Sequence, residues 1–187
     1  MASAGKTDRD QGGQPRLDRL PAWTGHGDAI QVVIETPKGS RNKYAYDPKV
    51  GLFRLKKALP AGMAFPYDFG FVPSTLADDG DPLDVLVLID DAIFPGCVIS
   101  CRIIGAILGD QRDEAKRNVI RNDRLIAIEQ STHGYAFLRK VSELGKTFVK
   151  ELEHFFVTCH DLSAEKFRVL DAVGPNKALK LVRAAER

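Results

Sequence analysis

The feature that most constrains this chain is a run of acidic residues that leads directly into an apolar segment. Residues 79–84 read DGDPLD and place three carboxylates within six positions, and residues 85–89, VLVLI, follow at once. Crowded carboxylates raise one another's pKa, so a folded chain keeps them together only where water or cations neutralise them. The glycine and the proline of the run favour a tight, stiff turn that would direct Asp79 and Asp84 toward one centre, with Asp81 between them. The run predicts a site for hard cations beside a buried strand.

Two known carboxylate motifs differ from this acidic run in spacing or in order. An EF-hand loop requires glycine at its sixth position and glutamate at its twelfth; counted from Asp79, those positions hold Asp84 and Asp90, so the run is not an EF-hand. A phosphotransferase whose aspartate nucleophile ends a strand would carry the apolar segment before the acids, whereas here it follows them. A polar surface turn before a strand stays open as the simplest alternative.

Around the acidic run, the chain resembles the soluble family I inorganic pyrophosphatases. The resemblance rests on DGDPLD at 79–84, VVIETP at 32–37 and NKY at 42–44, covers roughly residues 30 to 172, and weakens after about residue 106. It implies a five-stranded OB-like barrel with helices packed outside. It also implies hydrolysis of inorganic pyrophosphate to two phosphates by a metal-activated water. The implied cofactor is Mg²⁺, as several ions, with Mn²⁺ or Zn²⁺ as substitutes.

Composition excludes several other classes of protein. A chain of 187 residues with 44% hydrophobic and 28% charged residues suits one domain with a sizeable core. The net charge of +2 and the lack of a long Lys or Arg block argue against a nucleic-acid partner. No apolar run is long enough for a membrane span. Three cysteines without a C-x-x-C pair suit reduced thiols. These features predict a cytoplasmic protein without a membrane or nucleic-acid partner.

The pattern along the chain predicts an α+β fold that is mainly β. Residues 1–15 have almost no apolar anchor and are expected to form a disordered leader, before a single domain over 16–187. A packed loop is expected at 60–73 and a polar excursion at 109–123. Short strands before helices favour a small closed barrel. Strands are predicted at 29–34, 43–46, 51–55, 83–89, 98–108 and 124–129, and helices at 142–156, with Ser142 as N-cap, and 176–185.

The resemblance also implies roles for the acidic residues. Asp79 and Asp84 take the positions of metal ligands. Asp81 takes the position of the catalytic acidic group that handles the proton of the attacking water. Glu35 falls on a further acidic position that lines the site. Cleavage of a phosphoanhydride needs such carboxylates to hold cations that neutralise phosphate and activate water.

On the substrate side, the resemblance is less complete. Lys43 matches a lysine that holds substrate phosphate, and Lys56 stands where the family usually has arginine, so it offers a point charge without a bidentate fork. His160, after Cys159, stands in place of a phosphate-binding lysine and leaves a half-charged imidazole there. The family's nearby glutamate and two tyrosines are replaced by Ala45, Phe65 and Phe69.

A second group of acidic ligands is harder to place. Family members carry one aspartate and then another two residues before a lysine; here Arg124 replaces that lysine, which puts Asn122 on the second aspartate position. Asp110 is the predicted match to the first aspartate and metal ligand, with Asp113 as its rival. Asp123 is a neighbouring candidate. A charged surface loop is the alternative.

Three functions stay open at this point. The first is a cytoplasmic, Mg²⁺-dependent inorganic pyrophosphatase. The second is a catalytically weak relative that binds phosphate or metal, and the third is a hydrolase of a larger phosphoanhydride. The resemblance implies a homo-oligomer, with a hexamer as one possibility.

Overall fold

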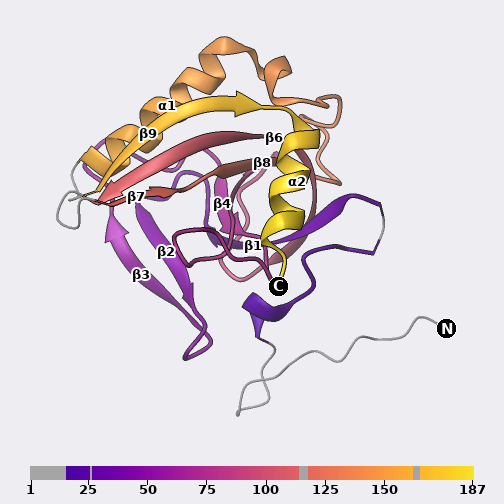
Figure 1. Ribbon diagram of the computed structural model, residues 1–187, viewed down its shortest axis with the longest axis horizontal. Coiled ribbons are helices and arrows are strands. Elements are labelled where there is room, and N and C mark those ends of the chain that lie inside the picture. Colours follow the sequence, from indigo (N-terminus) through magenta and orange to yellow (C-terminus); the bar gives the residue numbers. More distant parts are fainter. Residues whose placement is uncertain (1–15, 26, 114–117, 162–164) are drawn as a thin grey trace.

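Five strands close on themselves in the computed structural model, which describes residues 16–25, 27–113, 118–161 and 165–187 (Figure 1). The order around the ring is β1-β4-β5-β8-β6, and β6 pairs back with β1. All these pairs are antiparallel except β5 with β8, and register shifts make the ring irregular. The predicted fold class, with an OB-like strand ring, is confirmed. The strands are β1 (Ala29–Thr36), β4 (Asp68–Phe71), β5 (Asp84–Leu88), β6 (Val98–Asp113) and β8 (Arg124–Glu129).

Strand β6 is long enough to pair with four other strands. Its first part pairs with β1 and β8 inside the ring, while its last part pairs with β7 (Asn118–Arg121) and with β9 (Glu165–Val173). The polar segment predicted as an excursion at 109–123 is thus largely a β-hairpin. The sequence did not predict these strands because their charged residues do not alternate with apolar ones, so no strand period is visible.

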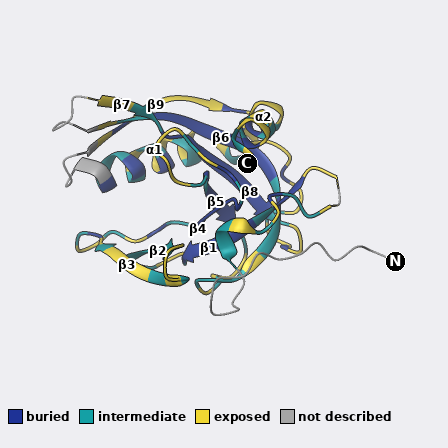
Figure 2. Cartoon of the chain, turned by 60° about the horizontal axis from the view of Figure 1, so that its bottom comes forward, coloured by how far each residue is buried: buried dark blue, intermediate teal, exposed yellow. Residues whose placement is uncertain are grey.

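A separate two-stranded sheet lies beside the ring. It consists of β2 (Asn42–Asp47) and β3 (Leu52–Ala58), paired antiparallel across the turn at 48–51. Figure 2 shows this hairpin mostly half-buried or exposed, in contrast to the buried strands of the ring. One side of the hairpin is therefore free to line a surface cleft.

The two α-helices of the described residues pack on opposite faces of the strands. The long helix α1 (Gly145–Asp161) lies against β9, and α2 (Pro175–Ala185) packs on β6 (Figure 1). Two short 3₁₀ helices, η1 (Leu17–Arg19) and η2 (Val141–Leu144), complete the described elements. None of the helices in the described parts of the chain combines the length and hydrophobicity needed to cross a lipid bilayer.

Burial on both strand faces explains the continuous apolar runs of the sequence. In β8, Leu125 and Ala127 belong to one hydrophobic cluster, whereas Ile126 and Ile128 belong to another. The first cluster includes α2, and the second includes Leu152 and Phe156 of α1. Because successive side chains of a strand point to opposite faces, a strand covered on both sides must be apolar at every position.

Two further strands were not predicted. Strand β4 lies inside the segment predicted as a loop at 60–73; its four residues are all buried, which is too short a run for a periodic signal. Gly70 is required there because a Cβ atom would collide with the Val33 carbonyl oxygen of β1. Strand β9 does alternate, since Phe167 and Val173 are buried between exposed residues, but its high charge hides the pattern.

The predicted helix at 142–156 was right in kind and wrong in its limits. Ser142 lies in η2, and α1 begins only at Gly145, where a φ of 83° redirects the chain. The carboxylate of Glu143 accepts the backbone N–H of Arg139 at 2.7 Å and so closes the turn before α1. The segment predicted as a disordered leader, 1–15, lies outside the described residues, and a single domain over 16–187 stays a prediction.

Candidate active site

One surface cleft of about 1120 Å³ collects most of the predicted site residues. Its lining forms three walls, which we name by their chemistry. The acidic wall comprises Asp79, Asp81 and Asp84, the basic wall Lys43, Lys56 and Lys57, and the amide wall Gln111 and Asn122; Glu35, Ala45 and Arg124 also line the cleft.

The acidic wall is formed by the β4–β5 connection and the first residue of β5. Its turn is fixed by the Asp79 carboxylate, which accepts the backbone N–H of Asp81 at 3.1 Å. Burial raises the pKa of Asp79, and the negative charges of Asp84 and Asp81 raise it further. The wall therefore carries negative charge that its protein neighbours do not fully compensate, as the crowding in the sequence indicated.

One of these carboxylates is already paired with a buried arginine. Asp84 and Arg124 are register partners on β5 and β8, and Nη1 of Arg124 lies 2.8 Å from the Asp84 carboxylate. Only 3% of the Arg124 side chain is exposed, and its guanidinium lies over the rings of Phe156 and Phe167 at 5.5 and 5.4 Å. Nη1 also donates to the side-chain oxygen of Asn122. Arg124 thus ties the acidic wall to the amide wall.

The amide wall stands where the second group of acidic ligands was sought. Asn122 is buried, and its Nδ2 donates to Oε1 of Gln111 at 2.6 Å. The backbone N–H of Asn122 donates to the Gly109 carbonyl at 2.8 Å and holds the chain at the start of β8. Gln111 was missed at the sequence level. The alternation of β6 was the available signal, since it places Gln111 and Asp110 on opposite faces.

Asp110 lies apart from the residues that line the cleft. Its carboxylate pairs with Arg168 at 3.2 Å and with Arg121 at 3.7 Å, across the strands on either side of it. Asp123 accepts Nε of Arg121 at 2.7 Å and the backbone N–H of Gly109 at 3.1 Å, and it is also absent from the cleft lining. The structure therefore does not bring Asp110 together with the acidic wall. The side chain of its rival Asp113 lies outside the described residues.

Glu35 closes the floor of the cleft beneath the hairpin. Its Oε1 accepts the backbone N–H of Tyr46 in β2 at 2.7 Å, and only 8% of the residue is exposed. Burial raises the pKa of Glu35 to about 7; the hydrogen bond from Tyr46 and the charge of Lys43 act against this rise, while Asp84 and Asp81 add to it. Near neutral pH, Glu35 is therefore divided between its acid and carboxylate forms.

Replacement of Glu35 by glutamine should make stability less dependent on pH. Glu35 ionises at a pKa of about 7 in the folded chain, against 4.5 for an exposed glutamate, so folding costs nothing at this group below pH 4.5 and progressively more up to pH 7. Glu35→Gln should match the parent near pH 4.5 and exceed its free energy of unfolding by about 3 kcal/mol above pH 7. Urea unfolding of both proteins with EDTA at pH 5 and pH 8 measures this difference. An equal gain at both pH values would contradict it.

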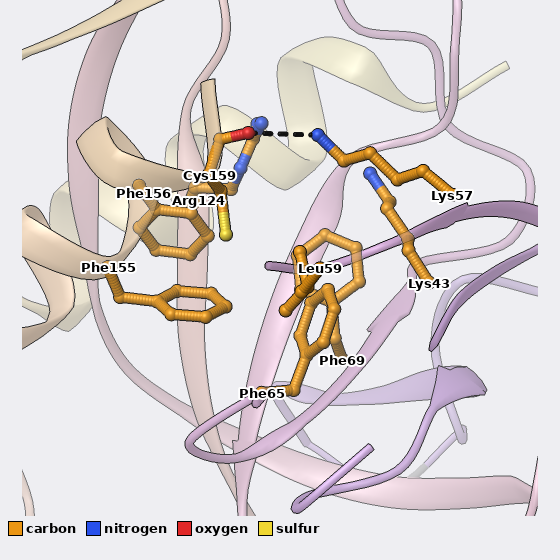
Figure 3. Close-up of a pocket in the computed structure, with 9 residues that line it drawn as sticks. All are labelled: Lys43, Lys57, Leu59, Phe65, Phe69, Arg124, Phe155, Phe156 and Cys159. Atoms are coloured by element: carbon orange, nitrogen blue, oxygen red, sulfur yellow. Dashed lines mark hydrogen bonds between the residues drawn. The ribbon is translucent and has the colours of Figure 1, made fainter. Parts of the chain in front are cut away.

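The basic wall comes from the β2–β3 hairpin and meets the end of α1. Figure 3 shows the amino groups of Lys43 and Lys57 directed toward the same region, with Phe65 and Phe69 packed below them. Nζ of Lys57 donates to the Cys159 carbonyl at 3.0 Å, and Nζ of Lys43 lies 5.2 Å from the centre of the Phe69 ring. Lys56 is exposed on the cleft. Phe69, which has no hydroxyl group, thus supports Lys43 by packing.

The thiol of Cys159 belongs to a small apolar pocket behind this wall. The pocket encloses about 30 Å³ between the hairpin, the 60–69 segment and α1 (Figure 3). Burial raises the pKa of the Cys159 thiol, although Lys57 and Lys43 oppose the shift. Cys159 is therefore a neutral packing residue. His160 follows it in the last turn of α1, but the His160 side chain lies outside the described residues.

The acidic wall suits a hard cation held with water and substrate oxygens. Within the described ranges, no three acidic, histidine or cysteine side chains converge as a ready-made metal centre. Mg²⁺ is commonly bound by one or two carboxylates together with waters and substrate phosphates, so a closed cage is not required. The raised pKa of Asp79 shows a carboxylate that a nearby cation would stabilise in its charged form. The donor set fits Mg²⁺ bound in this open manner.

Comparison with known proteins agrees with the fold. Residues 32–187 match the family model described as inorganic pyrophosphatase. The inorganic pyrophosphatase of Thermus thermophilus is 36% identical over 171 residues, which cover 90% of this chain and 94% of that one. That of Streptomyces coelicolor is 42% identical over 137 residues, or 73% and 80% of the two chains.

Solved structures give the same result. The crystal structure of inorganic pyrophosphatase from Thermus thermophilus aligns with a TM-score of 0.83 at 34% identity, over 91% of this chain and 96% of that one. An inorganic pyrophosphatase from Coxiella burnetii aligns with a TM-score of 0.79 at 30% identity, over 89% and 97%. The chain belongs to the inorganic pyrophosphatase family, which confirms the resemblance seen in the sequence.

Proposed function

We propose that this chain hydrolyses inorganic pyrophosphate to two phosphates. The observation that carries the proposal is the meeting of acidic and basic walls in one cleft, which provides a place for cations beside a place for phosphate. Relatives named inorganic pyrophosphatase, at 36% to 42% identity over most of their length, support this reaction. They do not favour a catalytically weak binding protein or a hydrolase of larger phosphoanhydrides.

The residues of the cleft divide the chemistry between them. Asp79 and Asp84 would hold divalent cations, and the Asp81 carboxylate would accept the proton of the attacking water within hydrogen-bond reach. Lys43 and Lys56 would bind the phosphate oxygens, while Glu35 lies beneath them. Lysine ammonium groups act as point charges, so they neutralise phosphate without fixing its orientation as a guanidinium fork would.

The cofactor that fits this cleft best is Mg²⁺, with Mn²⁺ or Zn²⁺ as substitutes. When bound, such an ion lowers the pKa of a coordinated water and offsets charge on phosphate oxygens. The acidic wall offers oxygen ligands alone, since its members are aspartates, and this favours a hard cation. Phosphate release from pyrophosphate at saturating Mg²⁺ tests the proposal. Release from triphosphate or a nucleotide, but not from pyrophosphate, would contradict it.

His160 provides a further test on the substrate side. We propose that its imidazole binds phosphate, because it follows Cys159, whose carbonyl accepts a bond from Lys57 of the basic wall. Histidine imidazoles gain a proton near pH 6.5, so KM for pyrophosphate should fall below that pH. His160→Lys should flatten this dependence, and steady-state kinetics from pH 5.5 to 8 measures it. A His160→Ala variant with the parental KM profile would remove His160 from the site.

We also propose that the chain acts in the cytoplasm and assembles as a homo-oligomer. Three free cysteines, Cys97, Cys101 and Cys159, support action in the reducing cytoplasm. Exposed apolar side chains, including Phe94 and Phe137, support a homo-oligomer, with a hexamer as one possibility. Light scattering of the purified chain determines the number of subunits.

A further inference from the structure

The amide wall is the part of the cleft that the proposed reaction leaves without a role. Gln111 comes from the extension of β6, and Asn122 comes from the connection between β7 and β8. The Asn122 oxygen accepts Nη1 of Arg124, and the Gln111 oxygen accepts Nδ2 of Asn122 at 2.6 Å. Both amide oxygens are thus already hydrogen-bonded within the protein. A cation that used either oxygen would have to compete with these bonds.

The charge beside the amide wall also opposes cation binding. Neutral amide oxygens compensate none of the charge of a divalent ion. The guanidinium in contact with Asn122 carries a permanent positive charge and is almost fully buried, where repulsion is weakly screened. Arg124 also pairs with Asp84 at 2.8 Å, which compensates one of the three negative charges of the acidic wall. The other two carboxylates of the wall have no arginine partner within the described residues.

We infer that the acidic wall is where this chain binds divalent cations in the absence of substrate, and that the amide wall with Arg124 takes the place of a second group of metal ligands. The inference rests on the proposed function, because it concerns the same cleft. It makes this cleft asymmetric: cations offset phosphate charge at the acidic wall, whereas the amide wall beside the Arg124–Asp84 pair holds none.

Equilibrium dialysis with Mn²⁺ alone, without pyrophosphate, tests the inference directly. The parent chain should bind about one tightly held Mn²⁺ per chain, since two carboxylates of the acidic wall have no arginine partner in the described parts of the chain. Asp79→Asn should weaken this binding, whereas Gln111→Ala should not change the number of ions. The double variant Gln111→Asp/Asn122→Asp should bind about one more Mn²⁺, because it sets two carboxylates side by side.

Two control variants test whether the extra Mn²⁺ binds at the substituted amide wall or reflects only the change in charge. Gln130→Asp makes the same substitution at an exposed position just beyond the opposite end of β8 and should add no Mn²⁺. Asp110→Asn removes a charge next to Gln111 on the other face of β6 and should also leave the number unchanged. Circular dichroism checks that each variant folds; if the double variant does not, Gln111→Asp alone should still raise Mn²⁺ affinity.

The possible outcomes separate this inference from the proposed function. Mn²⁺ binding that falls on Gln111→Ala, or a parent chain that already binds the number seen in the double variant, would overturn the inference even if pyrophosphate is hydrolysed. A gain of Mn²⁺ in the double variant with no hydrolysis by the parent would support the inference and reject the function.

Discussion

Asp81→Asn should reduce phosphate release from pyrophosphate by about 10²- to 10⁴-fold, the usual effect of losing a positioned general base. Asparagine keeps the size of the side chain but does not accept the proton of an attacking water. The variant should fold normally, because Asp81 is exposed on the cleft and its contact with Asp79 uses its backbone N–H. Steady-state kinetics at saturating Mg²⁺ measures the loss, and an unchanged rate would reject the enzymatic proposal.

Two neighbouring substitutions provide the control for Asp81. Asp79→Asn and Asp84→Asn should raise the Mg²⁺ concentration needed for half-maximal activity, and excess Mg²⁺ should partly restore their rates. Asp81→Asn should not be restored, since its defect is in proton transfer. If all three variants respond alike to Mg²⁺, then Asp81 acts as a metal ligand and not as the base.

Arg124→Leu should lower the free energy of unfolding by about 3 kcal/mol, the lower end of the cost of breaking a buried ion pair from one side. The substitution removes the pair with Asp84, the bond to Asn122 and the contacts with two phenylalanine rings. The lower end applies because 20% of the Asp84 side chain stays exposed to water. Urea unfolding in EDTA measures the change through the midpoint at constant slope.

A second substitution shows whether the lost ion pair is the cause. Arg124→Leu/Asp84→Asn leaves no uncompensated charge, so it should be more stable than Arg124→Leu alone. Arg124→Leu should also gain more stability from added Mg²⁺ than the parent gains, because its Asp84 is no longer paired. If the double variant is simply the sum of the two single losses, packing against the phenylalanines explains the effect.

The sequence predicted the acidic side of the cleft better than the rest. DGDPLD is a local run, so one tight turn suffices to bring its carboxylates to one place, and Glu35 lies on a strand with a clear apolar pattern. Lys43 lies on the half-buried β2, where the resemblance and not an apolar pattern indicated it. A five-stranded barrel was predicted, and the ring of β1, β4, β5, β6 and β8 agrees with it. The individual strands β4 and β9 were not predicted, because the short β4 and the charged β9 show too little periodicity.

The second side of the cleft depends on register across strands, which a sequence does not display. Asp110 and Gln111 are adjacent in the chain, yet the pleat of β6 directs one toward Arg121 and Arg168 and the other into the cleft. The resemblance to the family favoured Asp110 as the ligand. The pairing of β6 with β7 and β9 places the two side chains on opposite faces, and it depends on contacts far apart in sequence. The role of Asp110 as a metal ligand stays a prediction.

The attachment of the β2–β3 hairpin has a consequence for substrate affinity. No backbone ladder joins the hairpin to the ring in the described residues; it is fixed by side-chain bonds, in which Tyr46 donates to Glu35 and Tyr44 exchanges bonds with Thr36. An isolated two-stranded hairpin is only marginally stable, so we expect this unit to open at lower free energy than the ring. The lysines proposed to bind phosphate lie on that unit, so we expect part of the binding energy to be consumed in ordering them. Affinity for phosphate should then depend on how firmly the hairpin is anchored as well as on its charges.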